Sequence, residues 1–365
     1  MWIKAAIIEE AGQDFQIVDM ELDAPQYGEV LVKVAACGIC HTDDVARAQL
    51  IPVPLPAVFG HEGCGIIEQV GEGVTGFAHG DRVGFSYGYC GECEACRTAM
   101  PYGCTENRRL NFGGVQYDNT KRLRYQGREV SSFFGQAAFA THAVVHYNNL
   151  IHAPDDVPLE LIGPLGCGIQ TGAGAIFNYL HPQADSAIVV TGCGPVGLSC
   201  IMAAKIAGCS KIIACDIIES RLDLALELGA THKINSNNVK SVPTAVREIT
   251  DGIGANYAVD CTGIGACVRQ SLNCVRAVGI CVVLGATQEL TINVEEELMG
   301  TAKTLAGLVE GLSIPQIFIP KLLSYYRQGR FPFDRLIKTY DFHEINQAFE
   351  DTKKGNVIKA IIKMS

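Results

Sequence analysis

The sequence predicts an α/β protein of two domains, one predominantly β and the other a parallel, doubly wound sheet. Its 365 residues exceed the roughly 250–300 at which a single hydrophobic core stops growing, so two domains are expected. Short runs rich in Val and Ile, separated by Gly, Pro and Asp, fill residues 1–168. From Ala187 onward, apolar runs alternate with helical patterns, which indicates a parallel sheet covered by helices.

The individual elements follow in chain order. In the first domain, the clearest strands are predicted at Glu29–Ala35 and Gly65–Val70. In the second, strands are expected at AIVVT (187–191), KIIAC (211–215), YAVD (257–260) and ICVVLG (280–285), with helices between them, one of which begins at Glu219. The final apolar run, Val357–Lys363, is expected to rejoin the first domain. The predicted domains are therefore residues 1–168 with 310–365, and residues 169–309.

Composition excludes several classes of function. The formal net charge of -10 leaves no basic surface to attract phosphate backbones or anionic membranes, so nucleic acid is not an expected partner. The weakly charged stretch Ser186–Ala204 contains Pro195 and three glycines, which indicates a strand, a turn and a helix rather than a membrane span. Since the N-terminus lacks the long apolar run of a signal peptide, a cytoplasmic location is expected. In such a compartment, the 16 cysteines indicate metal binding or catalysis.

The strongest single pattern is a cluster of four cysteines. Cys90, Cys93, Cys96 and Cys104 follow the spacing C-x2-C-x2-C-x7-C, which allows four thiolates to converge on a tetrahedral zinc ion. Two disulfides are the alternative, but a reducing compartment disfavours them. Since a site with four protein ligands has no position left for water or substrate, this zinc is expected to support folding.

A nucleotide-binding pattern follows the strand at 187–191. Gly192, Gly194 and Gly197 form a Gly-x-Gly-x-x-Gly turn that opens a helix, and Asp216 ends the next strand. This context predicts that the backbone approaches a pyrophosphate and that Asp216 binds the adenosine ribose, which would select NAD over NADP. The alternative for Asp216 is a cap on the following helix.

A second metal site is indicated more weakly. Cys40 lies in GICHTD and His61 begins a His-Glu pair about 20 residues later, so that a thiolate, an imidazole and carboxylates occur in one domain. Taken alone, such residues are more often a core cysteine and a surface pair.

The order of the motifs identifies a resemblance. GICHTD, GHEGCGIIEQVG, GDRV, the four-cysteine lobe, GCGIQTGAG and the glycine turn occur as in zinc-dependent medium-chain alcohol dehydrogenases, over essentially the whole chain. FFGQAAFATHAVV, GPLGCGIQTGAGAI and FPFDRLIKTYDFHEIN resemble the aryl-alcohol (benzyl alcohol) dehydrogenases in particular. The resemblance implies a GroES-like, predominantly β catalytic domain and a Rossmann domain that binds NAD.

The resemblance also implies roles for individual residues. Cys40, His61 and Cys167 match the three ligands of a catalytic zinc, with Asp43 behind the histidine and Glu62 on the far side of the metal. Thr42 matches the hydroxyl that hydrogen-bonds the substrate alcohol and begins its proton relay. Contacts with NAD are implied for His41, Thr171, Val196, Arg221 and Lys359. Many relatives complete the relay with a histidine where this chain has Val45, so the outer proton acceptor is not identified.

The implied activity is the reversible oxidation of primary aromatic or allylic alcohols with NAD and two zinc ions per chain, in a homodimer or homotetramer. An apolar substrate pocket is expected from Ile51, Phe133, Phe134, Ala286 and Val309. The alternative for the two phenylalanines is a place in the core. The alternatives are a geraniol-type dehydrogenase, a glutathione-dependent formaldehyde dehydrogenase, which would need a cationic pocket, and a crystallin-like protein that binds NAD without catalysis.

Overall fold

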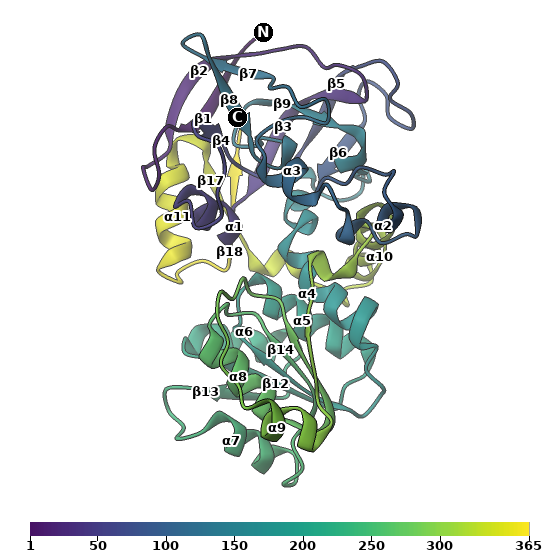
Figure 1. Cartoon of the computed structure of the whole chain (residues 1–365), viewed down its shortest axis with the longest axis vertical. Helices are drawn as coiled ribbons and strands as arrows, with labels where there is room; N and C mark the ends of the chain where they lie inside the picture. The colour runs from purple at the N-terminus through teal and green to yellow at the C-terminus, as the bar shows by residue number, and fades with distance from the viewer. Residues whose placement is uncertain (365) are drawn as a thin grey trace. The chain divides into compact units, whose positions relative to one another are not determined.

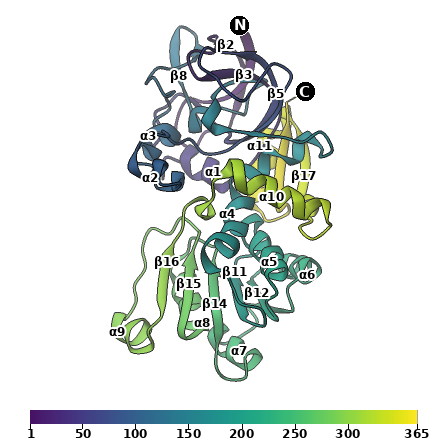
Figure 2. The same ribbon diagram turned by 90° about the vertical axis from the view of Figure 1, so that its right-hand side faces the viewer.

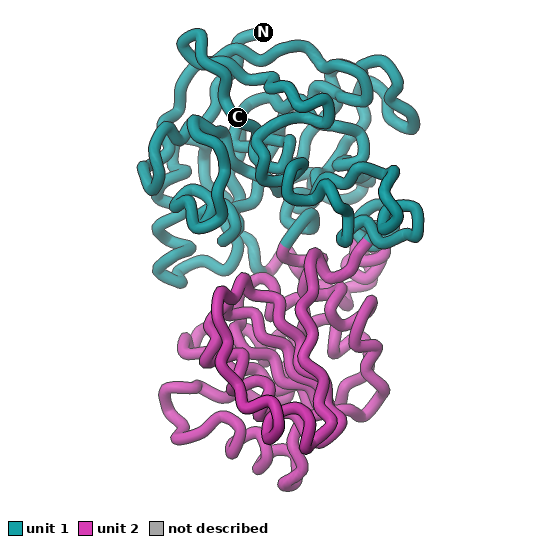
Figure 3. The backbone as a smooth tube through the Cα atoms, viewed as in Figure 1, with its two compact units in different colours: residues 1–167, 314–320, 336–365 teal, residues 168–313, 321–335 magenta. Residues whose placement is uncertain are grey.

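The computed structural model describes residues 1–364, and they form two compact units. Unit 1 comprises residues 1–167, 314–320 and 336–365, and unit 2 comprises residues 168–313 and 321–335 (Figure 3). The described helices include none that is both long and apolar enough to cross a membrane.

Unit 1 is built mainly from strands (Figure 1). Its strands are β1 (Trp2–Ile8), β2 (Gln16–Leu22), β3 (Glu29–Gly38), β4 (Ala57–Val58), β5 (Glu62–Val70), β6 (Arg82–Phe85), β7 (Leu123–Tyr125), β8 (Arg128–Ser132), β9 (His142–His146), β10 (Leu150–His152), β17 (Ile337–Asp341) and β18 (Lys359–Lys363). Its helices are α1 (His41–Arg47), α2 (Glu94–Arg97), α3 (Asn107–Phe112) and α11 (Ile345–Lys353).

Two sheets organise unit 1. Strands β1, β2, β7, β8 and β4 close into a barrel, and a second sheet has the order β10-β6-β5-β3-β18-β17, with β9 also paired to β3. The predicted strands at 29–35 and 65–70 are confirmed as β3 and β5, which pair antiparallel and bring Gly38 opposite Glu62. As predicted, the final strand joins this unit, because β18 pairs with β3. The site residues at the ends of β3, β5 and β18 are thereby brought together.

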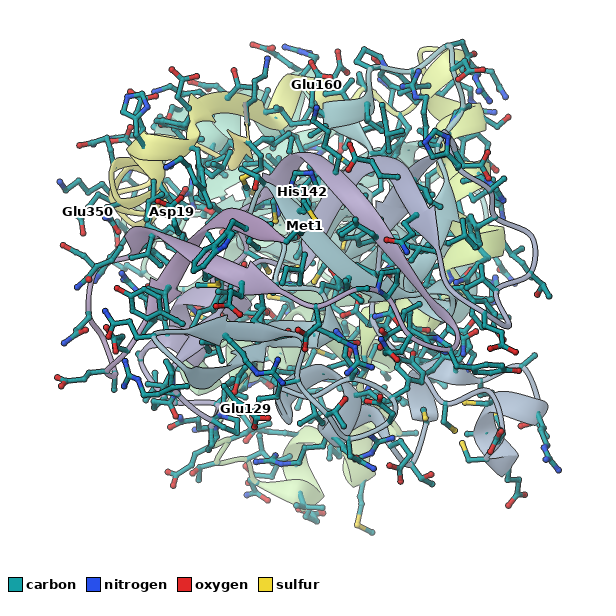
Figure 4. The ribbon with its side chains drawn as sticks, turned by 90° about the horizontal axis from the view of Figure 1, so that it is seen from above. Met1, Asp19, Glu129, His142, Glu160 and Glu350 are labelled. Carbon is teal, nitrogen blue, oxygen red and sulfur yellow. The ribbon has the colours of Figure 1, made fainter. Side chains whose placement is uncertain are left out.

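The outer surface of unit 1 carries acidic side chains from several elements. Figure 4 labels Asp19 on β2, Glu129 on β8, Glu160 in the short 3-10 turn at 159–161, and Glu350 on α11.

Unit 2 is a six-stranded parallel sheet with helices on its faces. Its strands are β11 (Ala187–Thr191), β12 (Lys211–Asp216), β13 (His232–Asn235), β14 (Ala255–Asp260), β15 (Val275–Val283) and β16 (Thr304–Gly307). Its helices are α4 (Gly168–Gly174), α5 (Pro195–Ala207), α6 (Glu219–Leu228), α7 (Val242–Ile249), α8 (Gly265–Cys274) and α9 (Val294–Glu297), while the division between the units falls within α10 (Pro315–Arg327).

The order of this sheet is β13-β12-β11-β14-β15-β16, and every pair in it is parallel. Figure 2 shows β16, β15, β14, β11 and β12 side by side in this order. The predicted fold class is therefore confirmed. Because the strand order reverses between β12 and β14, a crevice is expected at the carboxyl end of β11, where parallel sheets bind their ligands.

The return to unit 1 differs from the predicted boundary at residue 310. Residues 310–313 and 321–335 belong to unit 2. Asn178 donates a hydrogen bond to the carbonyl of Gly311 at 3.0 Å, and the ring of Tyr325 lies 5.5 Å from that of Phe177. These contacts join segments that are far apart in sequence, so the local pattern of residues 310–335 does not reveal them.

Candidate active site

The structure gathers four metal-binding side chains at the ends of β3, β5 and the segment before α4. Ligand atoms of Cys40, His61, Glu62 and Cys167 all lie within 4.8 Å of one another, and the two sulfur atoms are 4.0 Å apart. Three of these residues were predicted as zinc ligands, and Glu62 was predicted to lie near the metal. Since Cys167 is separated from Cys40 by 127 residues, only the fold brings them together.

His61 is oriented for metal binding. Its Nδ1 lies 3.0 Å from Oδ1 of Asp43, and both side chains are buried. Asp43 also accepts hydrogen bonds from the backbone N–H groups of Cys40 and Gly60, so its position is fixed. The other ring nitrogen, Nε2, is buried and has no hydrogen-bond partner among the described residues. A buried acceptor of this kind, beside two thiols, fits a zinc ion.

Burial, hydrogen bonds and neighbouring charges shift the pKa values of these groups. Burial alone would lower the pKa of His61, but the carboxylate of Asp43 and the sulfur of Cys40 raise it well above its usual value. Cys167 lowers the pKa of Cys40 well below that of a free thiol, against the effect of burial and with the support of His61. Since zinc binds the thiolate, a lowered thiol pKa favours metal binding.

Lys359 pairs with a carboxylate of the metal-binding cluster. Its ammonium group is buried, donates to the carbonyl of Ile39 at 2.9 Å and pairs with Glu62. Burial raises the pKa of Glu62 to about 7, although Lys359 opposes this effect. Lys359 is 1% exposed, and its contact with the pyrophosphate stays a prediction. The sequence could not show this pairing because the two residues are nearly 300 positions apart.

The remaining residues of GICHTD lie on α1. Oγ1 of Thr42 is 3.5 Å from the sulfur of Cys40, so the hydroxyl lies beside the metal-binding cluster. His41 is exposed, whereas Val45 is partly buried. The alkyl side chain of Val45 can neither donate nor accept a proton.

The four-cysteine cluster also assembles in unit 1. The ligand atoms of Cys90, Cys93, Cys96 and Cys104 lie within 4.8 Å of one another. Backbone N–H groups donate to these sulfurs, among them Cys93 N to Cys90 Sγ at 3.3 Å and Cys90 N to Cys104 Sγ at 3.3 Å. The alternative of two disulfides is not realised, because the 16 cysteines are all free in the described structure. Four convergent thiols stabilised by N–H donors fit a structural zinc ion.

In unit 2, the glycine turn joins β11 to α5 as predicted. Gly192 has φ +90°, which favours glycine, and a Cβ on Gly197 would lie 1.9 Å from the carbonyl oxygen of Gly192. A Cβ on Gly194 would meet nothing within 4 Å, so this side of the turn is open. The turn therefore has the geometry of a pyrophosphate-binding loop at a helix N-terminus. Val196 lies in the first turn of α5, and Thr171 is a buried residue of α4.

Asp216 is fixed against this turn. Its carboxylate accepts hydrogen bonds from the backbone N–H groups of Cys193 at 2.6 Å, Ile217 at 2.7 Å and Ile218 at 2.9 Å. It does not cap α6, whose N-cap residue is Ile218. Nε of Arg221, on the first turn of α6, is buried without a hydrogen-bond partner among the described residues. The carboxylate of Asp216 is an acceptor and Nε of Arg221 is an unpaired donor, and this pair of groups fits a nucleotide.

Two apolar residues near this turn escaped the sequence interpretation. Ile217 follows β12 and is 60% exposed, and Ile264 follows β14 and is 56% exposed. They come after strands on either side of β11 in the sheet. Ile217 comes directly after its strand, whereas Ile264 lies four residues beyond Asp260, at the N-cap of α8.

The residues predicted to line the substrate pocket have different surroundings. Phe133 and Phe134 are 0% and 4% exposed and belong to the core of unit 1, with Ile51 packed against that core. Ala286 and Val309 are exposed residues of unit 2. The pocket expected from these five residues stays a prediction.

Comparisons with known proteins agree with the two units. Residues 26–155 match the family described as alcohol dehydrogenase GroES-like domain, and residues 195–323 match the family described as zinc-binding dehydrogenase. The crystal structure of benzyl alcohol dehydrogenase from Acinetobacter calcoaceticus is 47% identical, with a TM-score of 0.96 and 100% of both chains covered. An alcohol dehydrogenase zinc-binding domain protein from Burkholderia ambifaria is 46% identical, also with a TM-score of 0.96, over 100% of this chain and 99% of the other. Geraniol dehydrogenase from Castellaniella defragrans is 39% identical over 98% of this chain and 97% of its own.

Proposed function

Because the chain belongs to the zinc-dependent alcohol dehydrogenases, we propose that it oxidises primary aromatic or allylic alcohols to aldehydes, reversibly, with NAD as hydride acceptor. The observation that carries the proposal is the cluster of Cys40, His61 and Cys167, which provides the two sulfurs and one nitrogen of a catalytic zinc site. The similarity to benzyl alcohol and geraniol dehydrogenases supports the substrate class.

The residues of unit 1 would hold the metal and handle the proton. Cys40, His61 and Cys167 bind the zinc ion, while Asp43 keeps the imidazole of His61 in the orientation that presents Nε2. When bound, zinc supplies Lewis-acid chemistry that lowers the pKa of an alcohol hydroxyl. The hydroxyl of Thr42, beside Cys40, accepts the proton of the substrate and passes it outward.

The residues of unit 2 would hold the dinucleotide. The glycine turn and the N-terminus of α5 receive the pyrophosphate, and the carboxylate of Asp216 accepts hydrogen bonds from the ribose. The Nε–H group of Arg221 donates a hydrogen bond to the cofactor, and the exposed side chains of Ile217 and Ile264 contact the adenine. When bound, NAD accepts the hydride, which is chemistry of the cofactor itself.

The substrate class has a chemical reason. Loss of hydride develops positive character on the carbinol carbon, and a neighbouring ring or double bond stabilises it and conjugates the aldehyde product. Benzyl alcohol and geraniol share this feature, although one is aromatic and the other is allylic. We therefore expect activity on both kinds of alcohol, because one methylene in an apolar site is worth only about 1–3 kcal/mol.

The test is a substrate panel followed by the absorbance of NADH. We expect kcat/KM for benzyl, cinnamyl and geranyl alcohols to exceed the values for ethanol and cyclohexanol. A preference for ethanol or cyclohexanol would contradict the substrate class without affecting the assignment to the family. Failure of Cys40→Ser to abolish turnover would contradict the proposed metal site.

A further inference from the structure

The segment Ser132–Phe139 makes a bend in unit 1 that local sequence does not require. Phe134 has φ +56° and ψ +19°, a left-handed conformation that bulky residues rarely adopt. Gly135 and Ala137 also have positive φ, at 60° and 55°. Since such backbone geometry persists only where the surroundings enforce it, the bend at Phe134 needs a structural reason.

Hydrogen bonds tie this bend to the residues directly before His61. The N–H of Ala138 donates to the carbonyl of Gly60 at 2.9 Å, and the N–H of Phe139 donates to that of Phe59, also at 2.9 Å. The side chain of Asn149 donates to the carbonyl of Phe134 itself at 3.2 Å. The backbone of Phe134 is therefore held in a fixed position relative to His61.

The result is a ring contact on the predicted zinc ligand. The ring of Phe134 stacks on the imidazole of His61, with centroids 4.4 Å apart and planes 25° apart. Phe133 approaches the same imidazole edge-on, at 5.5 Å and 85°. A hydrogen bond to Asp43 anchors one atom of the imidazole, Nδ1, whereas the stacked ring also restricts the tilt of its plane.

The other neighbours of Phe134 enclose its ring. The side chain is 4% exposed, and its other close neighbours are the rings of Phe133 and Phe112. Enclosed in this way, it faces the imidazole and the core.

We propose that Phe134 is a positioning residue whose ring holds the imidazole of His61 in the plane required for zinc binding. The inference rests on the proposed function, because it takes His61 to be a ligand of the catalytic zinc. The strained backbone of Phe134 is explained by this role, since a relaxed φ at residue 134 would move the ring away from His61. Loss of the ring would leave His61 free to tilt, and residues that orient metal ligands typically contribute 10–100-fold to metal affinity.

The experiment compares zinc release from two variants that each replace one buried phenylalanine of the same core by leucine. Phe134→Leu removes the ring stacked on His61. Phe349→Leu is the control, because Phe349 is buried in the same core but packs against Phe15 and Phe139. Each purified holoenzyme is dialysed against dipicolinate, and zinc per chain is followed by atomic emission. The Cys40→Ser variant is expected to hold only the structural zinc. Its release curve therefore identifies which of the released ions comes from the catalytic site.

We expect Phe134→Leu to release the catalytic zinc about ten-fold faster than the wild type, with the structural zinc retained and with Phe349→Leu unchanged. In cobalt-substituted protein, the visible absorption bands should shift in Phe134→Leu only. Phe134→Met, which fills the space without a ring, takes the place of Phe134→Leu if that variant does not fold.

Equal release rates and unchanged cobalt spectra in Phe134→Leu and Phe349→Leu would overturn the positioning role alone. A wild-type protein with the same zinc content as Cys40→Ser would instead overturn the proposed metal site, and this inference with it.

Discussion

The carboxylate of Asp216 is fixed by backbone hydrogen bonds and is the proposed binding group for the adenosine ribose. The N–H of Cys193 ties it to the glycine turn and the N–H groups of Ile217 and Ile218 hold its other oxygen, so its charge is fixed close to where the ribose of a dinucleotide is expected. A 2′-phosphate at that position would meet this charge at short range. We therefore expect coenzyme preference to depend on Asp216.

Replacing Asp216 by Ser should weaken the preference for NAD over NADP. We expect the ratio of kcat/KM for NAD to that for NADP to fall at least about ten-fold, or about 1.4 kcal/mol, because the repulsion is removed. The measurement is the initial rate of benzyl alcohol oxidation with each coenzyme. Asp223→Ser, an exposed acid on α6 that pairs with Lys233, is the control and should keep the original ratio. An unaltered ratio in Asp216→Ser would refute the assignment.

Burial of His146, at the end of β9, is expected to make folding stability depend on pH. It stacks on Tyr117 with centroids 3.6 Å apart, and burial lowers its pKa to about 4. In the unfolded chain its pKa is about 6.5, so between pH 6.5 and 4 the unfolded state binds the additional proton. The contribution of His146 to the free energy of unfolding is therefore complete at pH 7 and is lost as the pH falls through this window.

The variant His146→Phe should flatten this dependence. The difference in free energy of unfolding between pH 7 and pH 5 should be about 2 kcal/mol smaller than in the wild type, because phenylalanine cannot be protonated. Urea unfolding of both proteins at the two pH values measures it, and contributions from other titrating groups cancel in the comparison. Parallel decreases in both proteins would show that burial of His146 does not control this window.

At the scale of elements, the lobe around α2 depends on its four thiols. The helix α2 has four residues and buries none of them, so neither helix propensity nor hydrophobic packing can hold the lobe in place. The convergence of Cys90, Cys93, Cys96 and Cys104 replaces the missing core. A metal bound there contributes its binding free energy to folding.

Cys93→Ser should therefore destabilise this lobe locally. We expect the protein to lose one zinc ion and become sensitive to trypsin within residues 90–113, because a hydroxyl is a poor ligand for zinc. Limited proteolysis followed by mass spectrometry locates the cleavage. Cys267→Ser changes a cysteine outside both clusters and should behave as the wild type does. Resistance of the Cys93 variant to trypsin would exclude a structural zinc.

At the scale of the whole molecule, the two candidate metal-binding clusters belong to unit 1 and the glycine turn to unit 2. Metal binding and dinucleotide binding should therefore be separable by mutation. The contacts that orient each candidate site lie within its own unit, such as Asp43 with His61 in one and Asp216 with Cys193 in the other.

The wild-type chain should contain two zinc ions, and Cys40→Ser should contain one. We expect this variant to lose turnover while it remains folded and binds NAD, because residues 192–221 are unaffected. Atomic emission gives the zinc content, and calorimetric titration with NAD gives the affinity. One zinc in fully active wild-type enzyme would contradict the two-site arrangement.

The sequence alone was sufficient for features whose physical cause is local. The parallel strands follow from apolar runs between helical patterns, and the four cysteines and the glycine turn each lie within 15 residues, so spacing alone predicts their geometry. Cys167 was identified only through the resemblance of its surrounding motif, since nothing in its local spacing sets it apart from the other cysteines.

The tertiary structure decided what depends on contacts between distant segments. The pairing of Lys359 with Glu62, the return of residues 321–335 to unit 2 and the stacking of Phe134 on His61 each join elements that no local pattern relates. Apolar residues in a sequence indicate burial, but they do not specify which neighbour they contact. For Phe134, the left-handed backbone and the hydrogen bonds to Gly60 and Phe59 make that choice, and they exist only in the folded chain.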